Sequence, residues 1–198
     1  MNLIEFCKVA GIKQKHLTKV ERFYSEVSPY VGNKRIVNLC AGNSLLAWYF
    51  LMGGVTEEAL SIDLKSTKKY QTLRDLIKKV RPDLDAMHTF LERDIYDSEL
   101  GIQADDFILG LHACGNLTDR VIEIAVETGA SFAIVPCCYR PDRQLLRPQQ
   151  YKIPQDKSRE EVVDLLRAEY VSEKGREVSL REIKSFPSPM NRLLLSHI

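Results

Sequence analysis

In RIVNLCAGNSLLAWYFLMGG (residues 35–54), a short apolar run leads into a turn of small residues and then into a second, longer apolar run. The first run predicts a buried β-strand, because it is short and ends at a turn signal. The second run predicts a helix that begins near Ser44 and ends at the glycine pair. A strand, a tight turn and a helix in this order are typical of one unit of a parallel α/β sheet.

The segments around this stretch continue the alternation of helix and strand. Apolar spacing predicts an amphipathic helix over residues 15–27 that stops near Pro29. The other predicted strands cover residues 58–64, 87–95, 105–115 and 131–138, and the other predicted helices cover residues 67–80 and 117–129. Such alternation predicts an α/β fold in which helices cover both faces of a parallel sheet.

The C-terminal part predicts a different connection. A helix is expected over residues 158–170, followed by strands over residues 176–183 and 191–198. The few residues between these two strands are too short for a parallel crossover, which needs about a dozen residues or more. The two strands should therefore pair antiparallel.

Composition narrows the functional classes. The chain has 198 residues, 44% of them hydrophobic, and a formal net charge of +1, which argues against a surface that coats nucleic acid throughout. Basic residues gather in residues 65–81 and 140–152, although such runs are most often solvated faces. The five cysteines are an odd number and favour reduced thiols. The sequence has no membrane-length apolar run and no signal-like start, which predicts a cytoplasmic protein.

The turn after the first strand is a candidate ligand site. It consists of Cys40, Ala41, Gly42, Asn43 and Ser44 and keeps one glycine of the G-x-G-x-x-G pattern, so a pyrophosphate cradle is poorly supported and a plain tight turn is the alternative. Asp63 follows Gly42 by 21 residues, a spacing at which an acidic residue can bind ribose hydroxyls. Asp94 follows the third strand and could contact adenine. Each aspartate alone could equally be a solvated cap.

These motifs resemble those of the class I S-adenosylmethionine (SAM)-dependent methyltransferases. VNLCAGNSLL, SIDL and RDIYD are similar to the first three cofactor motifs of that family. LHACGNLTD, VPCCYR and SPMNRLLL resemble signatures of a subgroup that contains a tRNA 2′-O-methyltransferase and uncharacterised methyltransferase-like proteins. The resemblance implies a Rossmann-like three-layer α/β/α sandwich whose mostly parallel seven-stranded sheet has an antiparallel C-terminal strand. It assigns residues 31–198 to the methyltransferase domain and residues 1–30 to an N-terminal helical extension.

The same resemblance implies which residues bind SAM. They are Asn38, Cys40, Gly42, Asn43, Ser44, Asp63, Leu64, Asp94, Ile95 and His112. The chain departs from the family pattern at Asn38, where an acidic residue is usual, and at Cys40 and Ser44, where glycines are usual. Loss of the acid removes an anchor for the cofactor's ammonium group, which keeps open a catalytically silent scaffold. A nicotinamide dehydrogenase is a third, weaker reading, since the glycines are missing.

Candidate catalytic residues follow the fourth and fifth strands. His112 has an unperturbed pKa near 6.5 that suits a general base, although a purely structural histidine is the alternative. Cys114 and Cys138 are candidate catalytic thiols, which could add to a pyrimidine, yet simple burial is the commoner role. We predict no metal site, because Cys137 and Cys138 would point to opposite faces of a continuing strand.

The acceptor is predicted from the segment after the fifth strand. Arg140 and Arg143 could hold RNA phosphates, and Tyr139 could stack a base or line a pocket. RNA, possibly tRNA, is therefore narrowly favoured as the acceptor. Methylation of a small molecule or a protein is the alternative.

Overall fold

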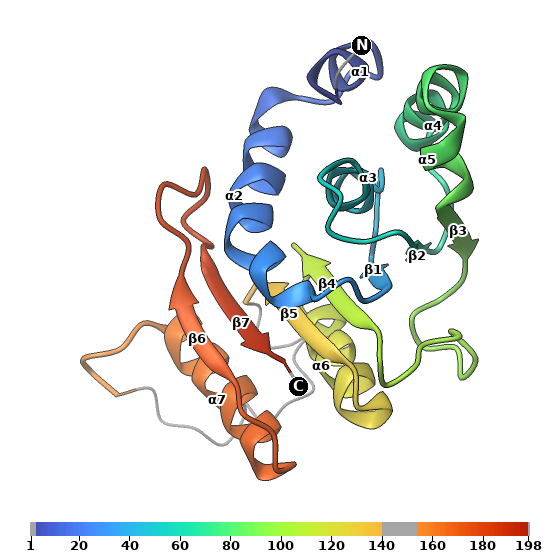
Figure 1. The fold of residues 1–198 in the computed structure, drawn as a ribbon. Coiled ribbons are helices and arrows are strands. Elements are labelled where there is room, and N and C mark those ends of the chain that lie inside the picture. The colour runs from blue at the N-terminus through green and yellow to red at the C-terminus, as the bar shows by residue number, and fades with distance from the viewer. Residues whose placement is uncertain (1–2, 140–153, 198) are drawn as a thin grey trace.

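The computed structural model describes residues 3–139 and 154–197 as seven strands and seven helices (Figure 1). The strands are β1 (Ile36–Leu39), β2 (Ala59–Asp63), β3 (His88–Glu92), β4 (Phe107–Leu111), β5 (Ser131–Val135), β6 (Ser179–Glu182) and β7 (Arg192–Ser196). The helices are α1 (Leu3–Val9), α2 (Gln14–Val31), α3 (Leu45–Met52), α4 (Lys68–Val80), α5 (Pro82–Ala86), α6 (Asn116–Thr128) and α7 (Arg159–Glu173).

All seven strands form one sheet in the order β3-β2-β1-β4-β5-β7-β6. β1 to β5 pair in parallel, and β7 pairs antiparallel with both β5 and β6. The predicted α/β class, the mostly parallel seven-stranded sheet and the antiparallel pairing of the last two strands are confirmed. Because β1 lies between β2 and β4, the carboxyl ends of these three neighbouring strands meet at one edge of the sheet.

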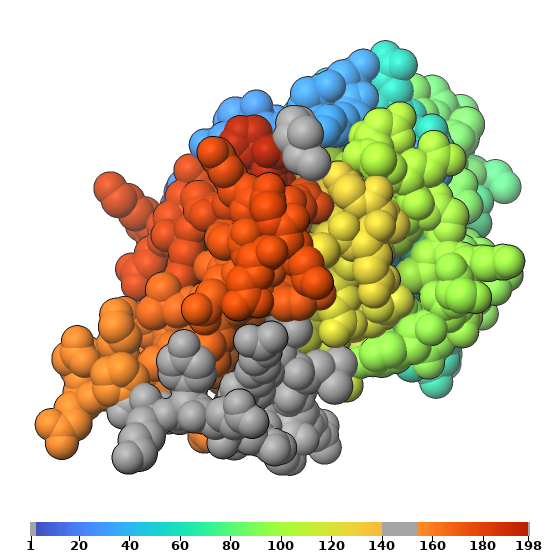
Figure 2. Space-filling view, turned by 90° about the horizontal axis from the view of Figure 1, so that it is seen from below, coloured from blue at the N-terminus to red at the C-terminus, as the bar shows by residue number. Residues whose placement is uncertain are grey.

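Two apolar clusters place the helices in layers. One cluster joins a face of the sheet to α1–α5, and the other joins the opposite face to α6 and α7. Figure 2 shows the second face, on which α6 (yellow) and α7 (orange) lie next to one another. The alternation along β1 fits this arrangement, because Ile36 packs in the first cluster and Val37 in the second.

α2 differs from its prediction in role rather than in where it ends. It continues through Pro29 and ends two residues later at Val31, where Gly32 follows in a left-handed conformation (φ 60°), so the expected end near Pro29 is confirmed. A proline one turn from the end removes few helical hydrogen bonds, which explains why the helix persists. The proposed domain boundary after residue 30 falls inside α2, whose apolar face packs in the core of the sheet.

The predicted strands are longer than the observed ones. The third was expected over residues 87–95, whereas β3 covers His88–Glu92, and the sixth was expected over residues 176–183, whereas β6 covers Ser179–Glu182. The short helix α5 was not predicted, and α1 was expected only as part of the N-terminal helical extension. Among the described residues, no helix is both long enough and apolar enough to cross a membrane.

Candidate functional site

A cavity of about 280 Å³ lies at the carboxyl edge of the sheet, between the first predicted cofactor motif and His112. It is bounded by the turn after β1, the first turn of α3, the end of β4 and one side of α2. Its lining includes Asn38, Cys40, Gly42, Asn43 and His112 from the predicted set, and His16 and Lys19 from α2. The volume is near the lower end of the range of about 300–1,000 Å³ that small-molecule sites occupy.

Gly42 forms the part of the turn that faces this cavity. It has a φ of +58°, and a Cβ added to it would meet nothing within 4 Å, so the backbone is open to a ligand on that side. Its N–H donates to Asp63 Oδ2 at 2.7 Å, while Asp63 Oδ1 accepts from the Leu64 N–H at 2.8 Å. Asp63 thus holds the turn in place, and each of its oxygens keeps a lone pair for a further donor.

Asn38 supplies a polar group that lacks a protein partner. The side chain is 3% exposed at the end of β1 and lines the cavity. Its Nδ2 is buried and finds no hydrogen-bond partner in the part of the chain that the structure describes. Since buried polar atoms are nearly always hydrogen-bonded, this amide indicates a site for a ligand.

The other predicted cofactor residues, which are Ser44, Asp63, Leu64, Asp94 and Ile95, do not line the cavity. Burial, followed by the charges of Asp63 and other nearby groups including Asp94, raises the pKa of Cys40 to about 12, so these side chains lie within electrostatic reach of one another. Asp94 is exposed, and its Oδ1 accepts from the Tyr96 N–H at 3.0 Å. Leu64 is 68% exposed, whereas Ile95 is buried.

Ser44 precedes α3 in a left-handed conformation (φ 55°). Its side chain is buried, and it makes no side-chain cap hydrogen bond to the helix. Its neighbour Asn43 instead accepts from the Leu45 N–H at 3.1 Å and lines the cavity. The first turn of α3 therefore follows the cavity wall, with Asn43 rather than Ser44 facing the open space.

His112 lies directly after β4 on the wall of the cavity. It has a φ of 66°, and its N–H donates to the Val135 carbonyl at 2.8 Å, which fixes the backbone between β4 and β5. Burial, then the positive charge of Lys19, lowers the pKa of His112 to about 4. His112 is therefore a neutral but weak base at pH 7, which weighs against the predicted role of general base.

Lys19 and His16 are cavity residues that sequence reasoning missed. Lys19 Nζ lies 2.9 Å from His112 Nε2 and 5.9 Å from the centroid of the Phe186 ring. An ammonium group at this position donates to Nε2 and leaves the ring proton of His112 on Nδ1. A sequence signal exists but is weak: His16 and Lys19 share one side of the α2 helix by their i, i+3 spacing.

The three cysteines after β4 and β5 converge. The Cys114 and Cys137 sulfur atoms are 2.8 Å apart, and Cys138 Sγ lies 3.5 Å from Cys114 Sγ and 3.6 Å from Cys137 Sγ. β5 ends at Val135, so the alternation of a strand does not extend to these residues. A strand that continues through Cys137 and Cys138 was the condition for their pointing to opposite faces, and that condition is not met.

Cys114 and Cys137 are poor nucleophiles in this arrangement. Burial raises the pKa of both Cys114 and Cys137, and the neighbouring thiols raise that of Cys137 further. A cysteine that adds to a substrate needs the thiolate form. Protonated thiols at neutral pH therefore weigh against the nucleophilic interpretation of Cys114.

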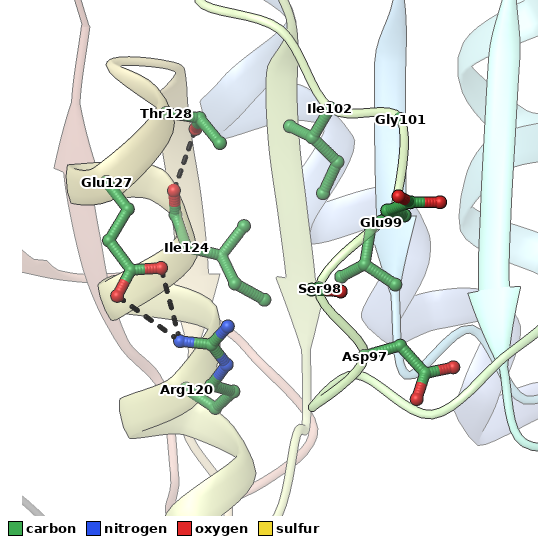
Figure 3. Close-up of a pocket in the computed structure, with 10 residues that line it drawn as sticks. Asp97, Ser98, Glu99, Gly101, Ile102, Arg120, Ile124, Glu127 and Thr128 are labelled. Carbon is green, nitrogen blue, oxygen red and sulfur yellow. Dashed lines mark hydrogen bonds and ion pairs between the residues drawn. The ribbon is translucent and has the colours of Figure 1, made fainter.

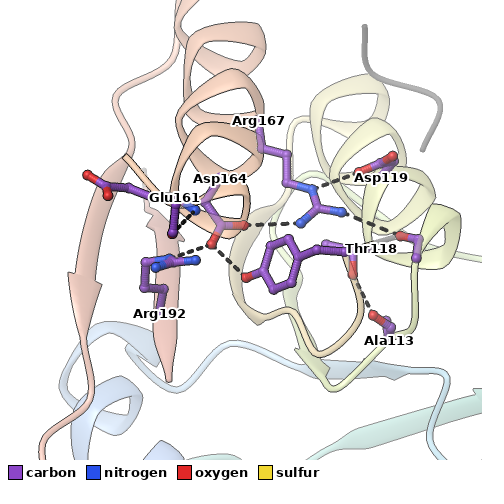
Figure 4. Close-up of polar contacts among 10 residues, drawn as sticks. Ala113, Thr118, Asp119, Glu161, Asp164, Arg167 and Arg192 are labelled. Atoms are coloured by element: carbon purple, nitrogen blue, oxygen red, sulfur yellow. Dashed lines mark hydrogen bonds and ion pairs between the residues drawn. The ribbon is translucent and has the colours of Figure 1, made fainter. Parts of the chain in front are cut away.

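Tyr139 bonds to a buried polar network whose members Asp119, Asp164, Arg167 and Arg192 are labelled in Figure 4. The side chain is 8% exposed, its hydroxyl donates to Asp164 Oδ2 at 2.6 Å, and burial raises its pKa. Arg192 donates to the same oxygen at 2.7 Å, and Arg167 donates to Asp164 Oδ1 at 3.1 Å and to Asp119 at 2.7 Å. Burial leaves the ring no open face on which a base could stack. Arg140 and Arg143 lie outside the described residues.

A second pocket lies apart from this site (Figure 3). It is lined by the segment from Asp97 to Ile102 and by α6 from Arg120 to Thr128. Its volume is about 120 Å³. Arg35, which precedes β1, donates to the Gly101 carbonyl at 2.8 Å, so this pocket is at the opposite edge of the sheet from His112. It contains none of the predicted site residues.

Comparison with known proteins points to one family. A sequence profile described as a methyltransferase domain matches residues 12–143 of this chain. The match includes α2 and every predicted cofactor residue, so the cavity lies within it.

Solved structures share the fold at low sequence identity. A SAM-dependent methyltransferase from Aquifex aeolicus is 13% identical, covers 99% of this chain and 98% of its own, and has a TM-score of 0.59. An rRNA methylase from Streptococcus thermophilus is 12% identical, covers 94% of this chain and 97% of its own, and has a TM-score of 0.54. These likenesses concern the fold.

A curated relative matches over a short segment. The human glutathione S-transferase C-terminal domain-containing protein is 58% identical over 31 residues, which are 16% of this chain and 5% of the relative. The match thus spans about one twentieth of the relative's length.

Proposed function

Because this chain belongs to the methyltransferase-domain family, we propose that it is a SAM-dependent methyltransferase that binds its cofactor in the cavity beside Gly42 and His112. The observation that carries this proposal is the buried Asn38 amide, whose Nδ2 finds no partner in the described protein. An amide offers both a donor and an acceptor, so it can bind either charged end of an amino-acid moiety. The unpartnered Nδ2 is a donor and suits the carboxylate of that moiety, whereas the usual acidic residue accepts from the ammonium group.

The remaining cofactor residues fit SAM by their chemistry. When bound, SAM supplies an electrophilic methyl group on a sulfonium. The open backbone at Gly42 allows close approach, and the free lone pairs of Asp63 can accept from the two ribose hydroxyls. Asp94 and Ile95 follow β3, where they can contact adenine. The remaining residues of the proposed set are Cys40, Asn43, Ser44, Leu64 and His112.

Calorimetry on a matched pair of glycine variants tests this proposal. Gly42→Ala and Gly54→Ala both place a Cβ on a residue with positive φ and open surroundings, but only Gly42 lines the cavity. Both variants should lose about 1–2 kcal/mol of stability to backbone strain. We expect wild type and Gly54→Ala to bind SAM and S-adenosylhomocysteine, and Gly42→Ala to bind them at least tenfold more weakly.

A second variant addresses the ribose contact. Asp63→Asn keeps an oxygen for the Gly42 N–H and removes the charge, which should weaken cofactor binding by roughly 10- to 100-fold, since a hydrogen bond to a charged group contributes about 1.5–3 kcal/mol. Asp75→Ala, at an exposed position of α4, is the control. Absence of SAM binding by the wild type would contradict the proposal and favour a catalytically silent scaffold. Binding of NAD instead would favour a dehydrogenase.

We propose RNA, possibly tRNA, as the acceptor. Arg140, Arg143 and Arg147 follow β5 in the sequence, and guanidinium groups suit phosphates. The S. thermophilus neighbour is described as an rRNA methylase, which is compatible with this choice. In this proposal His112, Cys114 and Cys138 lie towards the acceptor, with His112 neutral at physiological pH.

Transfer of radiolabelled methyl groups to cell fractions distinguishes the acceptors. Label that is removed by ribonuclease would support RNA, and Arg140→Ala with Arg143→Ala should then reduce labelling while calorimetric SAM affinity stays unchanged. Label in protein or in small molecules would overturn the RNA proposal and leave the cofactor proposal intact.

A further inference from the structure

We propose that Cys114, Cys137 and Cys138 form a binding site for a thiophilic divalent cation, with Zn²⁺ as the probe. The three sulfur atoms lie within 4.8 Å of one another, at the carboxyl ends of two neighbouring parallel strands. Thiolates are preferred ligands of Zn²⁺, and three protein ligands with one open position are a common arrangement for it. This inference does not rest on the proposed methyl transfer, although that proposal also places Cys114 and Cys138 towards the acceptor.

The sulfur positions are close to those a zinc ion requires. A Zn–S distance of about 2.3 Å in a tetrahedral site places sulfur atoms about 3.8 Å apart. Cys138 Sγ is 3.5 Å and 3.6 Å from the other two sulfurs, and the 2.8 Å separation of Cys114 and Cys137 must lengthen by about 1 Å. Because the Cys114 side chain is exposed, a rotation about its Cα–Cβ bond can move the sulfur atom by that distance without disturbing the core.

The backbone around the thiols is held from two sides. Cys137 Sγ and Cys114 Sγ lie 3.3 Å and 3.6 Å from the His112 carbonyl oxygen, so both point to one centre. The buried Arg167 donates to the carbonyl of Gly115, next to Cys114, at 3.4 Å. Tyr139, next to Cys138, is fixed by its bond to Asp164. The two segments that carry the ligands are thus positioned by the network of Figure 4 before any ion binds.

Three convergent thiols favour a cation over a disulfide. A disulfide would use two sulfurs and leave the third without a function, and its formation would need an oxidant. Within the described residues, the group consists of the three cysteines and includes no histidine or carboxylate as a fourth ligand. Water or another small ligand would therefore complete the coordination. His112 joins the two sites, because its carbonyl lies beside the thiols and its ring lines the cavity.

Zinc competition on the full chain tests the site. The protein is reduced with a non-thiol reductant under argon, its free thiols are counted, and it is titrated with Zn²⁺ against a chromophoric chelator. We expect one Zn²⁺ per chain for the wild type and for the control Cys7→Ala, which alters a buried cysteine of α1. Cys114→Ser should bind at least tenfold more weakly, and its circular dichroism should match that of the wild type because the altered side chain is exposed.

Co²⁺ substitution supplies a second readout. A thiolate-to-cobalt charge-transfer band should appear in the wild type and lose about a third of its intensity in Cys114→Ser, as expected when one of three thiolate ligands is removed. Less than a tenth of an equivalent of Zn²⁺ on fully reduced wild type, or equal affinity in Cys114→Ser and wild type, would overturn the proposal.

Discussion

At the scale of single residues, the sequence predicted the positions of the turn residues better than it predicted the pKa of His112. The turn at Gly42 and the carboxylate of Asp63 were predicted from spacing alone, and they are joined by a hydrogen bond of 2.7 Å. The pKa of His112 was not predictable, because it depends on burial and on Lys19, which is 93 residues away in the chain. A contact between residues so far apart in the sequence produces no pattern among neighbouring residues.

Removal of Lys19 should raise the pKa of His112. The positive charge of Lys19 disfavours the imidazolium form, so Lys19→Met is expected to move the pKa upward from about 4, although burial keeps it below 6.5. The measurement is a pH titration of the His112 ring signals by NMR. Lys15→Met, on the same helix, is the control, and an unchanged pKa in Lys19→Met would contradict the contact.

The same shift predicts how stability depends on pH. The folded-state pKa of His112 lies below the ordinary value of 6.5, so the unfolded chain binds the proton more readily. The contribution of His112 is therefore complete above pH 6.5 and is lost as the pH falls towards 4. In Lys19→Met, the free energy of unfolding should therefore fall less between pH 7 and pH 4 than in the wild type. Urea titration at each pH measures this difference.

At the scale of helices and strands, types were predicted well and ends were not. Alternation of apolar segments identified all seven strands, and the short connection between β6 and β7 predicted their antiparallel pairing. The strand after residue 131 was expected to include Cys137 and Cys138, whereas β5 ends at Val135. The buried network around Arg167 binds the residues that follow β4 and β5, and such long-range polar contacts are not visible in hydrophobic periodicity.

Loss of Arg167 should weaken the packing of α7 on α6. Arg167 is fully buried and pairs with Asp119 and Asp164, so Arg167→Met leaves two buried carboxylates without this cation. We expect a loss of about 3–5 kcal/mol in the free energy of unfolding, measured with urea. Arg81→Met, which removes an exposed pair with Asp83, should show no measurable change. Similar losses in both variants would contradict the role of burial.

At the scale of the whole molecule, α2 is part of the fold. The family resemblance placed the domain from residue 31 onward, because its recognisable motifs begin there. The structure instead packs α2 into the larger apolar cluster and uses it as one wall of the cavity. The sequence of an amphipathic helix reveals its apolar face, but it does not reveal which surface of the protein that face packs against.

A chain without residues 1–30 should not unfold cooperatively. It lacks Leu17, Val20, Phe23 and Val27 of α2, all at most 4% exposed. At about 1.5–3 kcal/mol for each buried side chain, their loss is comparable with a typical total stability of about 5–15 kcal/mol. Urea titration followed by circular dichroism measures this. A chain that begins at Lys13 keeps α2 and should unfold cooperatively at a lower midpoint. A sharp transition without α2 would show instead that residues 1–30 are an appendage.

The position of β7 between β5 and β6 has a consequence for biosynthesis. β5 and β6 are translated before β7, yet neither pairs with the other in the finished sheet. Until residues 192–196 leave the ribosome, the nascent chain therefore presents the open edge of β5, a strand that is buried at all five positions once folded. Pauses in translation shortly before residue 192 should prolong that exposure, and silent codon changes there would alter soluble yield without altering the protein.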